Sequence, residues 1–190
     1  MKLFYFCLFT FAFFLSSACR PAAAPVTVSN RPVSINDRPT TNVPMPPSKP
    51  MAEMSWTTAE DKVQKLGDLK GKAVILDFWA TYCPPCIEEI PHLNSLLAKH
   101  GAENLVIVGL NVGGAEDLPK IPAFTAKTKL NYPIAFPENE LSRFIFSDRS
   151  DIPQTLIIGR NGKIIKKIIG FNAAVQIELD AAVEEALKAN

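Results

Sequence analysis

Cys83 and Cys86 are the residues of this 190-residue sequence whose type and spacing point most directly to chemistry. A Cys-x-x-Cys pair can exchange a disulfide with a partner, because one thiolate attacks and the second thiol resolves the mixed disulfide. The same spacing could instead form half of a zinc site, or an inert buried disulfide. The other two cysteines, Cys7 and Cys19, lie close to the N-terminus. No second pair completes a zinc site, so we expect redox chemistry without a bound metal or cofactor.

The pair lies between a strand predicted at 73–79 and a helix predicted at 88–100. The strand, AVILDFW, is a continuous apolar run with one acid, and the helix has apolar residues at helical spacing. A cysteine that opens a helix meets unpaired backbone N–H groups and the positive end of the helix dipole, which favour its thiolate. Pro84 and Pro85 lack two of these N–H groups. They should shift the redox potential, in a direction that the dipeptide alone does not decide.

Strands and helices alternate through the rest of the predicted domain, which indicates an α/β fold. Further strands are predicted at 104–112, 132–136, 154–158 and 163–169, and further helices at 119–130, 138–146 and 173–188. The order of strand, helix and strand favours parallel pairing of 73–79 with 104–112. Asn161-Gly162 between two apolar runs predicts a hairpin. Together these segments predict a central mixed β-sheet flanked by helices.

Residues 19–53 are predicted to be a disordered tether, and the domain is predicted at 54–190. Eight prolines occur between 20 and 50, among small and polar residues with little apolar surface to bury. Over the whole chain, 20 Lys and Arg nearly balance 19 Asp and Glu. This balance disfavours the binding of nucleic acid, which needs a basic surface.

Residues 1–18 have the order of a secretory signal peptide, with a positive start, an apolar run at 3–15 and then small residues. The run is shorter than the roughly 20 residues that span a membrane, and a buried core helix is the alternative. The sequence LSSAC at 15–19 resembles a bacterial lipobox, although Ser16 stands where that motif usually has an aliphatic residue. The resemblance implies a lipid on Cys19. Ordinary cleavage before this cysteine would instead release a soluble exported protein.

The segment DFWATYCPPC at 77–86 resembles the active site of the thioredoxin superfamily, and its part FWATYCPPC resembles the TlpA and ResA branch. Pro91 stands where the family has a helix-kinking proline, and IPQT at 152–155 is similar to the family's cis-proline loop. Residues 132–171 are similar to the second half of that branch. The resemblance extends over 54–190 and implies a thioredoxin-like fold.

The resemblance also implies roles for single residues. Cys83 would be the nucleophile and Cys86 the resolving thiol, while Pro153 would follow a cis peptide bond. Ile152 would offer its backbone to a substrate chain in strand-like pairing. Tyr82 would shape the surface around Cys83.

Three further residues near the pair are candidates for the site. By resemblance, Trp79 would shape the same surface, but it could instead be core packing. Asp77 lies in an apolar strand, so it should have a raised pKa and could take the proton of Cys86. It matches thioredoxin's buried aspartate, at a position where TlpA and ResA relatives more often have Asn. Glu89 matches the acid of that branch's Cys-x-x-Cys-x-x-Glu, or it is a charge on the helix surface.

The resemblance implies a thiol-disulfide oxidoreductase that is exported across the cytoplasmic membrane and held in the periplasm or cell envelope by its lipid anchor. It would reduce disulfides in cysteine-bearing exported client proteins, such as apocytochrome c, with electrons from a membrane-embedded thiol reductase. A disulfide-forming oxidant is an alternative, and so is a module that binds clients or metal without turnover. A peroxidase is disfavoured, because its peroxidatic cysteine normally stands without a resolving partner so close in sequence.

Overall fold

The computed structural model describes residues 47–190. The signal peptide predicted at 1–18, the lipidation site Cys19 and most of the tether predicted at 19–53 lie outside the described residues, and they stay predictions. Within the described part of the chain, no helix is both long enough and apolar enough to cross a membrane.

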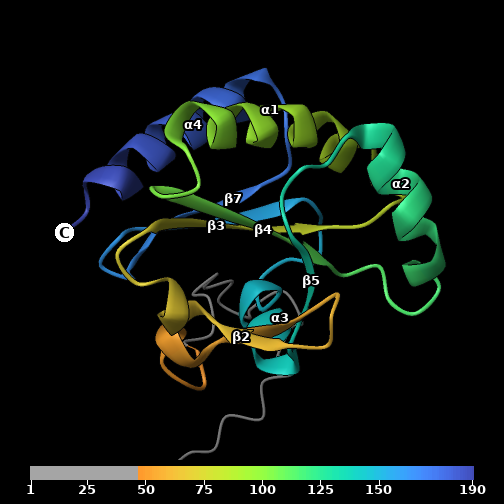
Figure 1. Cartoon of the computed structure of the whole chain (residues 1–190), viewed down its shortest axis with the longest axis horizontal. Coiled ribbons are helices and arrows are strands. Elements are labelled where there is room, and N and C mark those ends of the chain that lie inside the picture. The colour runs from red at the N-terminus through yellow and green to blue at the C-terminus, as the bar shows by residue number, and fades with distance from the viewer. Residues whose placement is uncertain (1–46) are drawn as a thin grey trace, which may run out of the picture. The chain divides into compact units, whose positions relative to one another are not determined.

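Within residues 47–190, seven strands form one mixed sheet in the order β2-β1-β5-β4-β3-β6-β7 (Figure 1). Their bounds are β1 Ser55–Thr58, β2 Val63–Lys65, β3 Ala73–Trp79, β4 Leu105–Asn111, β5 Ile134–Pro137, β6 Gln154–Ile158 and β7 Ile164–Ile169. The pairs β3 with β4 and β4 with β5 are parallel, and the other pairs are antiparallel. The predicted mixed sheet, its parallel pair and the hairpin at Asn161-Gly162 are confirmed.

The helices of the described residues cover both faces of this sheet. They are α1 Pro84–His100, α2 Ile121–Thr128, α3 Asn139–Ile145 and α4 Ala173–Lys188, with the shorter 3₁₀ helices η2 Met51–Glu53, η3 Leu66–Leu69 and η4 Leu118–Lys120. The helices α1 and α4 lie on one face, and α3 lies on the other (Figure 1). Because both faces of the central strands are covered, β3 and β4 are almost entirely apolar.

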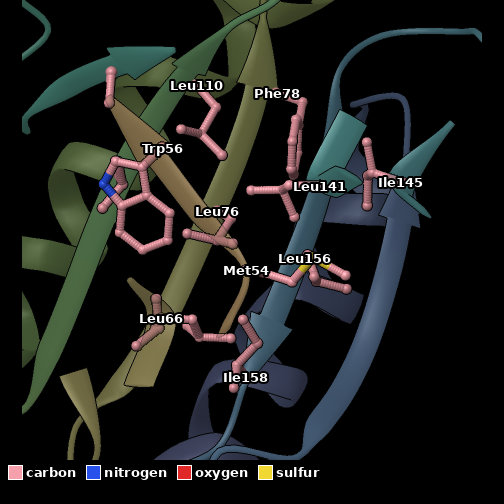
Figure 2. Packing of buried hydrophobic residues seen from close by; sticks show 13 residues of the cluster. Met54, Trp56, Leu66, Leu76, Phe78, Leu110, Leu141, Ile145, Leu156 and Ile158 are labelled. Carbon is pink, nitrogen blue, oxygen red and sulfur yellow. The ribbon is translucent and has the colours of Figure 1, made fainter. Parts of the chain in front are cut away.

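The strand β3 divides its side chains between two cores. Leu76 and Phe78 point into the core on the α3 side, where Figure 2 shows them packed among other apolar side chains. Ile75 packs on the opposite face, against α1 and α4. Side chains alternate along a strand, so Asp77 points to the same face as Ile75. The one acid of this strand therefore lies under α1.

Two regions of the fold, the hairpin at 55–65 and the start of α1, differ most from the sequence prediction. Residues 55–65 form an antiparallel hairpin of β1 and β2, where the sequence predicts no strand. These strands are only four and three residues long and Val63 is exposed, so apolar alternation does not reveal them. The helix α1 begins at Pro84 rather than at 88, because proline fits the first helical turn, where its N–H would be unpaired anyway.

The start of the described chain packs against the domain. The helix η2 falls within the segment that the sequence predicts to be a tether, and Met51 packs against the core on the α3 side. Lys49 forms an ion pair with Glu138, the residue directly before α3. These contacts attach residues 49–51 to the same core as the strands.

Candidate active site

Cys83 and Cys86 form a disulfide at the start of α1, with their Cα atoms 5.3 Å apart. Cys83 is the N-cap residue of α1, and its Sγ accepts a hydrogen bond from the backbone N–H of Cys86 over 3.2 Å. Pro84 and Pro85 occupy the first two helical positions and have no N–H. The Cys86 N–H is therefore the one donor that the first three helical residues offer to the Cys83 sulfur.

Both cysteines belong to a small apolar cluster with Trp79, Ile90 and Phe124. Cys83 is 4% exposed and Cys86 is 1% exposed. Trp79 is fully buried, and its ring stacks on that of Phe124 with ring centres 4.8 Å apart. Trp79 thus supports the pair from inside the protein, as the core-packing alternative expects. Contact between Trp79 and a client stays a prediction.

Tyr82 and Ile152 form the more exposed surroundings of the disulfide. Tyr82 is 64% exposed, directly before Cys83. Ile152 packs against the cluster of the disulfide, and its peptide bond to Pro153 is cis, as the resemblance implies. Within residues 47–190, the backbone N–H and C=O of Ile152 have no backbone hydrogen-bond partner. Tyr82 and Ile152 line a cavity of about 390 Å³ together with Val112, Phe146, Ser150 and Asp151.

Asp77 is buried on the α1 side of the sheet. Its Oδ2 accepts a hydrogen bond from the phenol of Tyr132 over 3.0 Å, and its Oδ1 has no partner among the described residues. Burial raises the pKa of Asp77 from 3.8 to about 7, and the bond from Tyr132 opposes this rise. A carboxyl with this pKa can exchange a proton near neutral pH.

Glu89 is buried as well, whereas its neighbour Glu88 is exposed. It follows Cys86 by three positions, so the two side chains lie on the same face of α1. Glu89 Oε1 accepts a hydrogen bond from the hydroxyl of Thr155 over 2.7 Å. Burial, and then the charge of Asp77, raise the pKa of Glu89 well above its usual range, while the bond from Thr155 opposes the rise. Glu89 is thus an interior acid and not a surface charge.

Tyr132 and Thr155 complete this buried site, although neither is among the candidate site residues predicted from the sequence. Thr155 pairs in register with Asp77 across β6 and β3, and Gly109 pairs with Asp77 across β4 and β3. A Cβ on Gly109 would lie 2.9 Å from Trp79 Nε1 and 3.0 Å from the Tyr132 ring. The glycine therefore leaves the space that the Tyr132 ring needs beside Asp77. A lone glycine inside a strand was the available signal, because it often marks a close approach.

A third buried acid, Asp117, holds the turn before the disulfide. Its carboxylate accepts hydrogen bonds from the Thr81 backbone N–H over 3.0 Å, from the Thr81 hydroxyl, and from Asn111 Nδ2 over 2.8 Å. Burial alone would raise the pKa of Asp117, but these bonds outweigh burial and hold it below its usual value. Asn111 ends β4, so Asp117 joins the end of the sheet to the turn that leads into Cys83.

Sequence comparisons agree with this geometry. A sequence model of the AhpC/TSA family matches residues 47–167. The chain is 34% identical over 122 residues to a thiol-disulfide oxidoreductase ResA of Bacillus cereus, a match that covers 64% of this chain and 69% of that relative. It is 32% identical over 106 residues to the ResA of Bacillus subtilis, covering 56% of this chain and 58% of that relative.

Solved structures with the same arrangement of strands and helices include the following two proteins. A thiol:disulfide interchange protein of the thioredoxin family from Chlorobium tepidum has a TM-score of 0.60 and 27% sequence identity, over 74% of this chain and 98% of that one. StoA from Bacillus subtilis has a TM-score of 0.52 and 26% identity, over 68% of this chain and 98% of that one. The predicted thioredoxin-like fold is confirmed.

Proposed function

Since the chain belongs to the AhpC/TSA family and is a thiol-disulfide oxidoreductase of the ResA kind, with its redox pair at Cys83 and Cys86, we propose that it reduces disulfides in exported client proteins. The observation that supports reduction rather than oxidation is at the start of α1, where, within residues 47–190, the backbone N–H of Cys86 alone donates a hydrogen bond to Cys83 Sγ. A thiolate there receives less stabilisation than at a helix start with all of its N–H groups. A less stabilised reduced form has a lower redox potential, which suits a dithiol donor.

The reduced enzyme would act in two exchanges. The Cys83 thiolate attacks one sulfur of the client disulfide, which forms a mixed disulfide and releases the other client sulfur as a thiolate. Cys86 then loses its proton and attacks Cys83 Sγ, which releases the second client thiolate and leaves the pair oxidised. Two electrons and the Cys86 proton pass from the enzyme to the client, and the other client thiolate takes its proton from solvent. A membrane-embedded thiol reductase is the proposed donor that reduces the pair again.

The buried acids under α1 are the proposed acceptors of the Cys86 proton. Glu89 follows Cys86 by one helical turn, and Thr155 connects Glu89 to the strand position beside Asp77. A carboxyl whose pKa is raised to about 7 is suited to general base catalysis near neutral pH. This position supports the predicted base role of Asp77.

Client binding is proposed at Ile152 and Tyr82. The backbone N–H and C=O of Ile152, unpaired within residues 47–190, can pair with an extended client segment in the manner of strand addition. Pro153 stays a predicted part of this surface. The cavity beside Tyr82, with Val112 and Phe146 in its wall, offers apolar contact to a side chain next to the client cysteine. Both features favour an extended client segment.

The proposed location is the periplasm or cell envelope, where clients would be cysteine-bearing exported proteins such as apocytochrome c. The support lies in the order of residues 1–18 and in the lipobox-like LSSAC that ends at Cys19. The part of the predicted tether that lies between Cys19 and Lys49 would hold the domain away from the membrane, since residues 49–53 belong to the folded domain. Radiolabelled palmitate tests the anchor. The label should appear on the wild-type protein and be lost in Cys19→Ala, whereas an unlabelled wild type would mean a released protein.

Reduction of insulin by dithiothreitol tests catalysis, with the full chain and Cys83→Ser compared side by side. We expect the wild type to accelerate the reaction and Cys83→Ser not to, while equal rates would favour a binding module. The redox potential of the Cys83–Cys86 couple against glutathione tests the direction. A value near that of thioredoxin, about −270 mV, supports a donor, and a value near that of DsbA, about −120 mV, would make the protein an oxidant.

A further inference from the structure

The buried carboxyls of Asp77 and Glu89 share one structural neighbour, Thr155. Thr155 and Asp77 pair in register across the antiparallel strands β6 and β3, so their side chains leave the sheet side by side on one face. On that face, the Thr155 hydroxyl donates to Glu89 Oε1 over 2.7 Å. The helix α1 therefore brings Glu89 to the sheet position of Asp77, and the two acids form one buried cluster.

No cation balances this cluster within residues 47–190. Neither carboxylate lies within 4.0 Å of a lysine, arginine or histidine nitrogen. The titratable group beside it is the Tyr132 phenol, which precedes β5. Cys86, one turn before Glu89 on α1, is bonded to Cys83 in the oxidised enzyme and has no proton to lose there. The cross-strand neighbours of Asp77, Gly109 on β4 and Thr155 on β6, carry no charge. Two ionised carboxylates here would repel each other without solvent or a counter-ion, and a proton on one of them removes that repulsion.

The hydrogen bonds leave each acid with one oxygen for such a proton. Tyr132 engages Asp77 Oδ2, and Thr155 engages Glu89 Oε1. Asp77 Oδ1 and Glu89 Oε2 are buried and have no partner among the described residues. Buried polar atoms of this kind are rare in folded proteins and call for an explanation. Each acid thus accepts a hydrogen bond from one hydroxyl, which favours its anion. Its other oxygen has no partner among the described residues and can hold a proton.

We propose that Asp77 and Glu89 hold a single proton between them in the oxidised enzyme, and that Tyr132 and Thr155 are positioning residues that keep the pair in this state. The role of these two acids in catalysis rests on the proposed function. Resolution by Cys86 needs a proton acceptor, and Glu89 lies one helical turn after Cys86 on α1. When Cys86 attacks Cys83 Sγ, its proton passes to the ionised member of the pair. The departing client thiolate takes a proton in return, so the pair ends as it began.

Carboxyl ¹³C NMR of the oxidised full chain in detergent tests the shared proton, with Asp77→Asn and Glu89→Gln used to assign the two carbons. Two acids that share a proton titrate in steps that belong to the pair. We therefore expect both carbons to report the same two steps. A single, separate step for each carbon would overturn the proposal, and so would two carboxyls that keep the same form throughout the titration.

The positioning role is tested by Tyr132→Phe and Thr155→Val. Each variant removes a donor to a carboxylate, so the steps should move to higher pH by about one unit, a tenfold change in proton affinity. Thr155→Ser keeps the hydroxyl and should restore the wild-type titration. Thr128→Val is the matched control, because it removes a hydroxyl bonded to the Phe124 carbonyl in α2, and it should change nothing.

An unshifted titration in Thr155→Val would overturn the positioning role, and the comparison of Val with Ser at 155 decides the question if Tyr132→Phe does not fold. The titration is measured on the oxidised enzyme without a client. Its failure is therefore distinguishable from a failure of the proposed function, which the insulin assay reports.

Discussion

Asp117 accepts a hydrogen bond from the backbone N–H of Thr81 over 3.0 Å, and this bond connects the loop after β4 to the turn that leads into Cys83. The two residues are 36 positions apart in the chain, so only the folded domain brings them together. Asp117 is buried, while its neighbour Glu116 is exposed. The placement of Cys83 therefore depends on a carboxylate well outside the Cys-x-x-Cys motif.

Replacing Asp117 by alanine should destabilise the oxidised protein by roughly 2 to 4 kcal/mol, because Thr81 and Asn111 lose a buried acceptor. The low pKa of Asp117 means that its stabilisation is present above the pKa of the unfolded chain and is lost as the pH falls through the folded value. The difference between wild type and variant in urea unfolding should therefore shrink in acid. Glu116→Ala is the matched control and should stay within about 0.5 kcal/mol of wild type. A loss no larger than the control's would contradict this assignment.

Asp77→Asn should slow the resolving step of Cys86 more than the first attack by Cys83. The amide cannot accept a proton from Cys86, and a positioned base contributes on the order of a hundredfold or more to such a step. Stopped-flow exchange with a client disulfide separates the appearance of the mixed disulfide from its decay. Equal slowing of both phases would refute the base role.

The stability of the folded protein should fall as the pH rises from about 4 to about 7, because burial raises the pKa of Asp77 to about 7. In this window the folded chain keeps a proton that the unfolded chain has released, so stability decreases with rising pH and levels off above it. The fall attributable to this carboxyl is on the order of 3 to 4 kcal/mol. Denaturant unfolding of wild type and Asp77→Asn over a series of pH values measures it. The variant should show a smaller fall with rising pH than the wild type, and parallel profiles for the two proteins would rule the effect out.

Tyr82→Ala should weaken the use of a protein client while sparing the chemistry of the pair. The variant removes one wall of the cavity beside the disulfide, so KM for insulin should rise by about tenfold, the equivalent of about 1.4 kcal/mol of lost contact. Reaction with a small aromatic disulfide, which needs no extended binding surface, should change by less than about twofold. Ile177→Ala is the matched control, since Ile177 is an exposed apolar residue of α4. Equal losses on both substrates would mean that Tyr82 acts on the cysteines and not on the client.

The central part of the fold could be predicted because each element has its own signal in the sequence. The strands β3 and β4 are continuous apolar runs, and the helix α1 has buried residues at helical spacing. The hairpin of β1 and β2 could not be predicted, because its strands are short and partly exposed. Its position is determined by pairing with β5, a contact between segments far apart in the chain.

The candidate site likewise contains residues that could be predicted from the sequence and residues that could not. Cys83, Cys86, Asp77 and Glu89 lie within one short stretch. The spacing of the cysteines, the apolar strand around Asp77 and the family resemblance bring them to notice. Their partners lie elsewhere, since the bond from Tyr132 to Asp77 spans 55 positions and the bond from Thr155 to Glu89 spans 66. These contacts depend on the register of β3 with its neighbours, which no local pattern specifies.

Gly109 limits how this sequence can change in evolution. A side chain there would meet Trp79 Nε1 at 2.9 Å and the Tyr132 ring at 3.0 Å, so it could be accepted only if the Trp79 ring shifts and position 132 makes room as well. A smaller residue at 132 would in turn take the phenol away from Asp77. Positions 77, 109 and 132, on three different segments, must therefore be inherited together, and a lineage that loses the glycine should be found to have rebuilt the acid site.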